Sequence, residues 1–323
     1  MALAVRDFDG SDRDYEAVAR IGNASVPDEP VNIEMLKHWD STWDARYMSR
    51  RMICERDGEP VASVRVAESQ WAYVPGKYLL WLYVLPEFRR QGVGTFAYDH
   101  VINELSKREL PPTAMIASAR EDVTEGVAFL EKRGYELTMR EQKSRLMLDD
   151  FAASDFESTD ERLAAGGIAV RSLAELMAED PDWTTKMWDL TWAIEQDIPW
   201  IDPPTRISFE KYVKYMNTPA FLPEAAFVAL DGEEWVGLSM VWKILSEPDK
   251  LYTELTGVLR SHRRKGIATA LKVRCIRWAV ENGYVRIDTD NEEKNPMYTL
   301  NVRLGFKPLP AWLRYRNVFD RSG

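Results

Sequence analysis

The spacing of apolar and polar positions divides the chain into two similar series of elements. Each series opens with a short strand, around Val5 or Val170, and continues into an amphipathic helical region over residues 12–43 or 173–216. A hairpin follows at an Asp-Gly turn, the favoured two-residue hairpin signal. A strand then leads into a glycine loop and a long helix. A short strand, a second helix and a closing strand that begins at Gly-Tyr or Gly-Phe complete each series.

The matching features recur at nearly constant distance along the chain. The glycine loops, at Gly92 and Gly266, are 174 residues apart, as are the two Asp-Gly turns, and the Gly-aromatic pairs at Gly134 and Gly305 are 171 residues apart. Fixed offsets across separate features indicate a tandem duplication. Because strands and helices alternate within each copy, the sequence predicts the α/β (α+β) class, with a mixed sheet in each copy.

A polar stretch rich in small residues, "DDFAASDFESTDERLAAGG", lies between the copies. It predicts an N-terminal domain over residues 1–150, a linker over 151–166 and a C-terminal domain over 167–323. The length of 323 residues suits two domains better than one core.

Composition narrows the classes of function. Lys and Arg number 42 against 52 Asp and Glu, a net charge of −10, which disfavours nucleic acid and anionic membranes as partners and is compatible with a cationic small molecule. The start, "MALAVRDFDG", is no secretory signal, and no apolar run is long enough to span a membrane. Cys54 and Cys275 lie in apolar patterns and predict small buried side chains, and the three histidines lack metal-ligand spacing. We expect a cytoplasmic, metal-free monomer or homodimer.

The glycine loops carry the most specific chemical signal. "VLPEFRRQGVG" and "VLRSHRRKGIA" each join a strand that ends in valine to the start of a long helix. Amides at a helix start are unpaired, the helix dipole favours an anion there, and small residues allow close approach. With arginines beside it, each loop predicts a cradle for a diphosphate.

Other phosphate-binding loops fit less well. Neither copy has the Gly-Lys-Ser/Thr ending of a P-loop, and neither has the three spaced glycines of a dinucleotide fingerprint. A glycine that only caps a helix, flanked by solvated arginines, is an ordinary structural alternative. The same loop occurs at the matching position of both halves of the chain, which weighs against that alternative.

Together these motifs resemble the GNAT acyltransferase superfamily. Arg89-x-x-Gly92-x-Gly94 and Arg263-x-x-Gly266-x-Ala268 are similar to its signature loop, and "VAFLEKRGY" and "NPMYTLNVRLGF" are similar to its second motif. The resemblance covers both copies and leaves out only the linker. It implies a tandem member with two GNAT-like domains, each a mixed, splayed β-sheet flanked by helices, that uses acetyl-CoA or another acyl-CoA.

The resemblance also implies where the cofactor binds. The diphosphate would lie on the loop amides, the pantetheine arm would pair with the splayed strand, and a backbone N–H near the strand-terminal valine would polarise the thioester carbonyl. The implied cofactor-binding residues are Val84, Arg89, Arg90, Gln91, Gly92, Val93, Gly94 and Thr95 in the first copy and Val258, Arg263, Arg264, Lys265, Gly266, Ile267, Ala268, Thr269 and Asn295 in the second.

Catalytic residues distinguish the copies. Many family members carry a Glu four residues before the strand-terminal valine; here that position is Glu254 in the second copy and Leu80 in the first. Strict alternation would place Glu254, Thr256 and Val258 on one face of the strand. A solvated acid at a strand start is the structural alternative for Glu254.

The second motif points to the same copy. The resemblance implies an Asn that contacts the cofactor, and the second copy offers Asn295 and Asn301, whereas "REDVTEGVAFL" has none. Neither copy has the family's Tyr four residues before the motif glycine, and Tyr298 could replace it as the acid that protonates the thiolate; water or a packing role are the alternatives. We therefore expect catalysis in the second copy, with Glu254, Asn301 and Tyr298, and consider the first copy the one that could be degenerate.

These features predict an acyl-CoA-dependent N-acyltransferase that acylates a small-molecule amine by direct transfer in a ternary complex. A non-catalytic acyl-CoA-binding or sensing protein is the alternative, and an aminoacyl-transferring enzyme that uses tRNA fits the acidic composition poorly. The loop "EQDIPWIDPP" supplies Glu195, Asp197, Asp202 and Trp200, which could hold a cationic amine, although acids in such a loop are usually only solvated.

Overall fold

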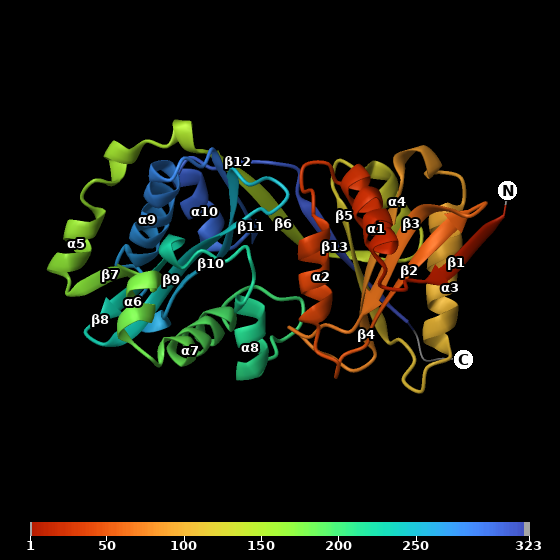
Figure 1. Ribbon diagram of the computed structural model, residues 1–323, viewed down its shortest axis with the longest axis horizontal. Coiled ribbons are helices and arrows are strands. Elements are labelled where there is room, and N and C mark those ends of the chain that lie inside the picture. Colours follow the sequence, from red (N-terminus) through yellow and green to blue (C-terminus); the bar gives the residue numbers. More distant parts are fainter. Residues whose placement is uncertain (1, 320–323) are drawn as a thin grey trace. The chain divides into compact units, whose positions relative to one another are not determined.

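The computed structural model describes residues 2–319 and groups them into two compact units. Unit 1 comprises residues 2–140, 201–205 and 312–319, and unit 2 comprises residues 141–200 and 206–311. Each unit is a mixed β-sheet flanked by helices, which confirms the predicted fold class (Figure 1).

Unit 1 contains the elements expected of the first copy. Its strands are β1 (Leu3–Asp7), β2 (Ser49–Arg56), β3 (Glu59–Ala67), β4 (Lys77–Val84), β5 (Ala114–Arg120) and β13 (Trp312–Val318), and its helices are α1 (Asp12–Ser25), α2 (Ile33–Ser41), α3 (Val93–Ser106) and α4 (Thr124–Glu131), with the 3-10 turn η1 (Pro86–Phe88). Strands β1 to β4 are antiparallel in sequence order, and β5 runs parallel to β4.

Unit 2 repeats this order. Its strands are β7 (Ile168–Ser172), β8 (Ala226–Asp231), β9 (Glu234–Lys243), β10 (Lys250–Val258), β11 (Arg286–Glu292), β12 (Lys307–Pro308) and residues 141–147 of β6 (Glu136–Met147). Its helices are α5 (Thr159–Ala165), α6 (Leu173–Glu179), α7 (Trp183–Glu195), α8 (Phe209–Met216), α9 (Ile267–Glu281) and α10 (Pro296–Arg303), with the 3-10 turns η2 (Leu148–Asp150), η3 (Ala153–Phe156), η4 (Pro223–Ala225) and η5 (Arg260–His262). Strands β7 to β10 are antiparallel and β11 is parallel to β10.

Each unit completes its sheet with a strand from the other half of the chain. In unit 1, β13 pairs antiparallel with β5, from Trp312 opposite Arg120 to Val318 opposite Ala114. In unit 2, the end of β6 pairs antiparallel with β11, from Glu141 opposite Glu292 to Met147 opposite Arg286. The closing strands of the two copies have thus exchanged sheets.

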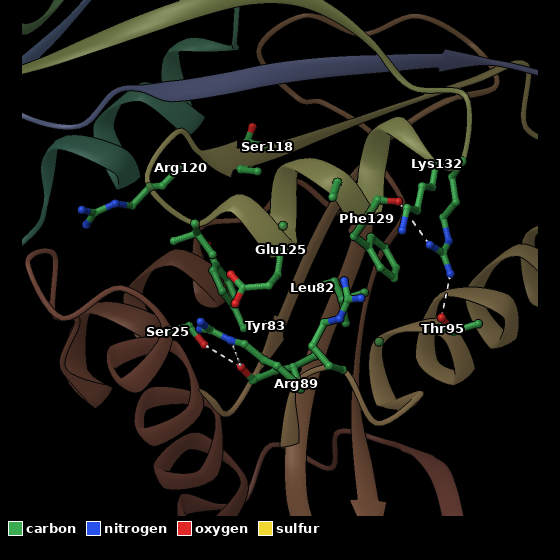
Figure 2. A pocket seen from close by; sticks show the side chains of 18 of the residues that line it. Ser25, Leu82, Tyr83, Arg89, Thr95, Ser118, Arg120, Glu125, Phe129 and Lys132 are labelled. Carbon is green, nitrogen blue, oxygen red and sulfur yellow. Dashed lines mark hydrogen bonds between the residues drawn. The ribbon is translucent and has the colours of Figure 1, made fainter. Parts of the chain in front are cut away.

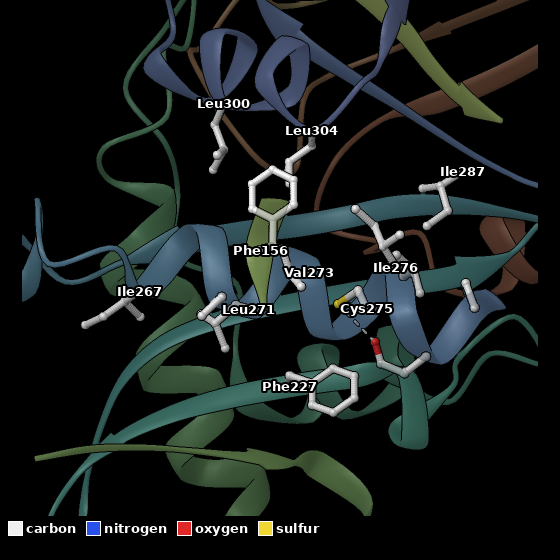
Figure 3. Packing of buried hydrophobic residues seen from close by; sticks show 14 of the residues in the cluster. Phe156, Phe227, Ile267, Leu271, Val273, Cys275, Ile276, Ile287, Leu300 and Leu304 are labelled. Carbon is white, nitrogen blue, oxygen red and sulfur yellow. Dashed lines mark hydrogen bonds between the residues drawn. The ribbon is translucent and has the colours of Figure 1, made fainter. Parts of the chain in front are cut away.

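Helices cover both faces of each sheet. In unit 1, α3 packs on one face through a buried cluster that includes Val64, Leu80 and Val101. On the other face α1 packs against β3 and β4, and α2 packs against α1 and pairs Asp40 with Arg51 of β2. In unit 2, α9 packs on the sheet through Leu271, Cys275 and neighbouring apolar side chains (Figure 3). Burial of these apolar faces stabilises each unit by the hydrophobic effect.

The segment expected as a linker is part of this packing. Phe156 and Leu163, at 7% and 4% exposure, belong to the apolar cluster of unit 2, and α5 contacts α9 and β7. Residues 151–166 therefore contribute to the hydrophobic core of unit 2.

The expected hairpin turn and the two expected buried cysteines are present in the structure. Asp57 and Gly58 turn the first hairpin with φ of 52° and 87°, the pair of positive angles that a type I′ turn requires. Cys54 and Cys275 are free and buried. Among residues 2–319, no helix combines the length and apolarity needed to cross a membrane, and no group of three or more His, Cys, Asp or Glu side chains is placed to hold a metal ion.

Candidate cofactor loops and active site

The two glycine loops have the same main-chain conformation. Arg90 and Gly92 have φ of 61° and 83°, and Arg264 and Gly266 have φ of 63° and 83°. Positive φ at two positions so close together turns successive N–H groups toward one side, the arrangement that binds anions. The strain of a non-glycine residue at positive φ is retained in both copies.

A helix begins directly after each loop. The amides of Phe96 and Ala270 bond to the carbonyl oxygens of Gly92 and Gly266, which completes the first turn of α3 and of α9. The three amides before each of them have no intrahelical acceptor. Both predicted cradles therefore carry the orphan amides and the helix dipole that favour a phosphate.

The strand before each loop separates from its parallel neighbour, as the family resemblance implied. Strand β4 is paired with β5 only over Lys77–Leu80, and β10 is paired with β11 only over Lys250–Tyr252. The remainder of each strand, up to Val84 or Val258, lacks that partner. An unpaired strand edge is available to an extended ligand.

In unit 1 the loop adjoins a cavity of about 390 Å³. Around it, Figure 2 shows Tyr83 from the end of β4, Arg89 from the loop after η1, Phe129 from α4 and Lys132 directly after α4. Its wall also includes Trp312 of β13, which follows Arg89 by 223 positions in the sequence. The predicted residues Val84, Arg89, Arg90, Gly92, Gly94 and Thr95 all line this cavity.

The loop arginines of the two units have different partners. Arg89 and Arg263 both donate through Nε to the valine carbonyl at the strand end, at 3.2 and 3.1 Å. In unit 2, Asp197 pairs with both Arg263 and Arg260, and these guanidinium groups lower the pKa of its carboxyl. Among the described residues, neither Arg89 nor Arg90 pairs with a carboxylate. The second cradle therefore holds an internal anion beside it, and the first does not.

Strand β10 has a bulge at Glu254, and this overturns one expectation. The pairing with β9 shifts between Thr253 and Leu255, so Glu254 is the extra residue. Thr256 bonds to Ser239 at 2.8 Å and Val258 packs in the α9 cluster, whereas the carboxylate of Glu254 accepts from Tyr215 of α8. The prediction that Glu254, Thr256 and Val258 share a face was wrong, because the bulge interrupts the alternation.

Glu254 lies in a partly buried acidic and aromatic environment. Burial raises its pKa to about 7, with a further contribution from Asp290, against the hydrogen bond from Tyr215. Burial and the charge of Glu254 likewise raise the pKa of Glu195, at the end of α7, to about 7. Neither carboxylate pairs with a basic side chain among the described residues, so both are poised to exchange a proton near neutral pH.

Two more tyrosines face these acids. The hydroxyl of Tyr252 donates to Asp290, and burial beside that carboxylate raises the pKa of the tyrosine. The pKa of Tyr212 is also raised, first by burial and then by Glu195 and Glu254. Tyr212, Tyr215 and Tyr252 had no place in the sequence-based site, because α8 and β10 meet only in the folded unit.

The structure gives local roles to the asparagines of the second motif. Asn295 caps α10, and its side chain accepts from the amide of Met297 at 2.9 Å. Asn301 is 1% exposed and donates to Asn291 of β11 at 2.6 Å. Tyr298 lies partly exposed on the same helix. Their predicted parts in cofactor binding and catalysis stay predictions.

The described residues of unit 1 form no counterpart of this acidic site. Strand β4 pairs with β3 without a shift in register, and Leu80 is buried against α3 in the apolar cluster. The difference predicted between Glu254 and Leu80 is thus a difference in register as well as in residue type.

The residues proposed for the acceptor loop do not act as one group. Glu195 lies near Glu254, and Asp197 pairs with the loop arginines. Asp202 belongs to unit 1, where it pairs with Lys77. The indole N–H of Trp200 donates to the carbonyl of Glu195 at 2.9 Å. Only Glu195 of the three acids is placed beside Glu254.

Comparison with known sequences identifies the class. The acetyltransferase (GNAT) family matches the chain twice, over residues 15–135 and 184–306. The chain therefore belongs to this family, as a tandem two-domain member. No match was found among curated protein sequences.

Solved structures share the fold at low sequence identity. The tandem GNAT protein from the clavulanic acid biosynthesis pathway has a TM-score of 0.76 and 17% identity, and all of both chains is covered. A GCN5-related N-acetyltransferase from Sphaerobacter thermophilus has a TM-score of 0.70 and 18% identity over 98% of this chain and 95% of that one. A putative acetyltransferase from Pyrococcus horikoshii has a TM-score of 0.56 and 14% identity over 98% and 90%.

Proposed function

We propose that the protein is an N-acetyltransferase that transfers an acetyl or other short acyl group from acyl-CoA to the amine of a small molecule in a ternary complex, with the chemistry in unit 2. The observation that carries this proposal is the position and environment of Glu254. It stands on the strand that leads into the cofactor loop, is partly buried without a basic partner, and has a pKa raised to about 7.

The residues present fit acyl-CoA. Each loop offers orphan amides, a helix start and arginines for a diphosphate, and each preceding strand leaves an edge for an extended arm. Bound acetyl-CoA would supply the thioester whose acyl group is transferred. Asn295 and Asn301 would support this site, and Tyr298 remains the predicted donor of a proton to the thiolate.

Glu254 would take the proton that the amine loses. A base with a pKa near 7 is about half ionised at neutral pH and is strong enough to accept a proton. Tyr215 donates to one carboxylate oxygen and fixes its direction. The neighbouring Glu195 adds negative charge that attracts a cationic amine before deprotonation.

Unit 1 would bind acyl-CoA without transferring the acyl group. Its cavity favours binding, as do Arg89 and Arg90, which pair with no carboxylate among the described residues. The buried Leu80 leaves the corresponding strand position without a proton acceptor. A protein in which neither unit catalyses transfer, an acyl-CoA sensor, is the alternative that the following experiment excludes or supports.

The test measures release of free thiol from acetyl-CoA with a panel of amines, for the wild type and Glu254→Gln. General-base catalysis contributes about 10²- to 10⁴-fold, so Glu254→Gln should lose at least about 10²-fold in kcat/KM at pH 8 and keep its affinity for CoA. The exposed Glu281→Gln is the matched control. A variant as active as the wild type on every accepted amine would refute the role of Glu254, and no turnover by the wild type would support the sensor.

The pH dependence of kcat/KM tests the role of Glu254 independently. Only the ionised carboxylate accepts a proton, so kcat/KM should rise about tenfold per pH unit below the pKa of about 7 and level off above it. In Glu254→Gln, kcat/KM should no longer show this rise below pH 7. A wild-type profile that is flat from pH 5.5 to 8 would contradict the assignment.

A further inference from the structure

Unit 1 contains a second cavity, of about 730 Å³, that shares no lining residue with the cavity at the glycine loop. It lies beside α2, between Asp40 of that helix and Arg51 and Arg65 of the sheet. Its charged lining consists of Arg50, Arg51 and Arg65 with Asp7 and Asp40. Arg50 pairs with Asp7 and with Glu104, so the net positive charge of one is that of Arg51 and Arg65 over Asp40. An excess of positive charge in a cavity of an acidic protein points to an anionic ligand.

The arginines are a feature of this unit and not of the fold. Arg51, Arg65 and Trp81 stand directly opposite one another on β2, β3 and β4. In unit 2, the equivalent row, also counted three residues back from the strand-terminal valine, is Ala226, Met240 and Leu255. Apolar side chains therefore satisfy the fold at these positions, and the guanidinium groups need another explanation.

The two inner arginines share one carboxylate. Arg51 bonds to Asp40 at 2.8 Å and Arg65 lies 3.5 Å from the same oxygen, while their side chains are only 9% and 15% exposed. Nε of Arg51 is buried without a hydrogen-bond partner among the described residues. Burial lowers the pKa of Arg65 to about 10, which shows that the pairing only partly offsets its desolvation.

Aromatic rings hold both guanidinium groups in place. Arg65 lies over Trp43 at 4.5 Å and over Trp81 at 5.6 Å, and Arg51 lies over Phe8 at 5.3 Å. Such stacking leaves the edges of the guanidinium planes, which carry the N–H groups, open to hydrogen bonds. Nε of Arg65 donates to Ser49 at 3.1 Å, and the N–H groups of Arg51 and Arg65 that face neither Ser49 nor Asp40 have no partner among the described residues. The outer Arg50 is already paired with Asp7 and Glu104.

We propose that this cavity is a binding site for a small, planar organic carboxylate, held by the guanidinium groups of Arg51 and Arg65 between aromatic walls. A carboxylate matches the two-pronged edge of a guanidinium group, and a single negative charge matches the net charge of the lining. The site is separate from the acetyl-transfer site proposed in unit 2, and its failure would leave that proposal intact.

The experiment titrates the full-length protein with benzoate, inorganic phosphate and benzamidine, followed by calorimetry and by the fluorescence of the tryptophans. Benzoate should bind, and Arg65→Met, which installs the residue that unit 2 carries, should weaken benzoate at least tenfold, as expected for the loss of a charge-assisted hydrogen bond. Benzamidine, of the same shape and opposite charge, should not bind here. Arg46→Gln, on an exposed arginine outside the cavity, should bind benzoate as the wild type does.

Several results would overturn the proposal. They are the absence of benzoate binding to the wild type, equal binding to Arg65→Met, and preference for phosphate over benzoate. If Arg65→Met does not fold, Arg65→Lys keeps the charge but loses the planar fork, and it should still weaken benzoate by a factor of three or more. Unchanged binding in that variant would also count against the site.

Discussion

Units 1 and 2 repeat the same loop, with φ within a few degrees at both positive positions, but differ in the partners of its arginines and in the residue before the strand-terminal valine. In unit 1, Tyr83 lines an open cavity beside loop arginines that have no acidic partner among the described residues. In unit 2, the matching position is Gly257, against which Ile194 of α7 packs, and Asp197 holds the arginines. Duplication has preserved the main chain of the cradle and changed its surroundings.

The strands before the loops also differ between the two units. Strand β10 contains a bulge that turns Glu254 toward α7 and α8, while β4 is regular and turns Leu80 into the core. A slip of one residue in a strand exchanges the two faces. The chemistry of a duplicated domain therefore depends on register as well as on which residue stands at the aligned position.

The largest effect should follow from Leu80→Glu, which gives unit 1 the acid of unit 2 without the bulge. The carboxylate would point into the apolar cluster below α3, where Leu80 is 4% exposed. Burying an unpaired charge costs several kcal/mol, so we expect a loss of at least about 3 kcal/mol in the free energy of unfolding, measured with urea.

The control for this change is Leu137→Glu, at an exposed leucine of the same unit. Its free energy of unfolding should change by no more than about 0.5 kcal/mol. A stable Leu80→Glu protein with new acetyl transfer in unit 1 would show that register does not separate the two units.

Much of this fold could be predicted from the sequence, because its signals are local. The Asp-Gly turns, the valine that ends each strand and the glycine that precedes each long helix depend on neighbouring residues, and the structure places all of them as expected. The duplication strengthened each of these predictions, since a motif that occurs twice in the same position is seldom accidental.

The rest depends on contacts between distant segments. The exchange of β6 and β13 could not be predicted, because each closing strand has an equivalent edge available in either sheet. The bulge at Glu254 leaves no mark in "YTELTGV", and the pairing of Asp197 with Arg263 links residues 66 positions apart. Trp312 in the wall of the first cavity follows from the strand exchange alone.

A smaller effect should come from Gly257→Ala. It adds a side chain at the position of unit 2 that matches Tyr83 of unit 1. A Cβ atom there would lie 2.2 Å from Cγ2 of Ile194, a branched and buried side chain that cannot rotate away. Overpacking of this kind costs about 1–3 kcal/mol in the free energy of unfolding. Urea denaturation of the single variants and of Gly257→Ala with Ile194→Ala should reveal a favourable coupling of about 1 kcal/mol or more.

Gly22→Ala is the matched control, since Gly22 lies inside α1 with nothing within 4 Å of its added Cβ. It should stabilise the protein by about 0.5–1 kcal/mol, the ordinary preference of a helix for alanine. Additive costs in the double variant would mean that Ile194 does not hold the strand end closed in unit 2.

The smallest effect should be that of Asp197→Asn, which removes the internal anion from the second cradle. Arg260 and Arg263 would then be free to meet a diphosphate, and CoA should bind unit 2 about three- to fivefold more tightly. This difference of about 1 kcal/mol suits an ion pair whose two arginines are exposed, at 77% and 43%. Calorimetric titration with CoA in an Arg89→Ala background, where binding to unit 1 is weakened, isolates the second site.

Asp189→Asn is the control, because Asp189 pairs with Arg206 of the same unit and not with the loop. Weaker CoA binding in Asp197→Asn would mean that the carboxylate orders the arginines for the cofactor, and the two cradles would then differ in preorganisation and not in competition.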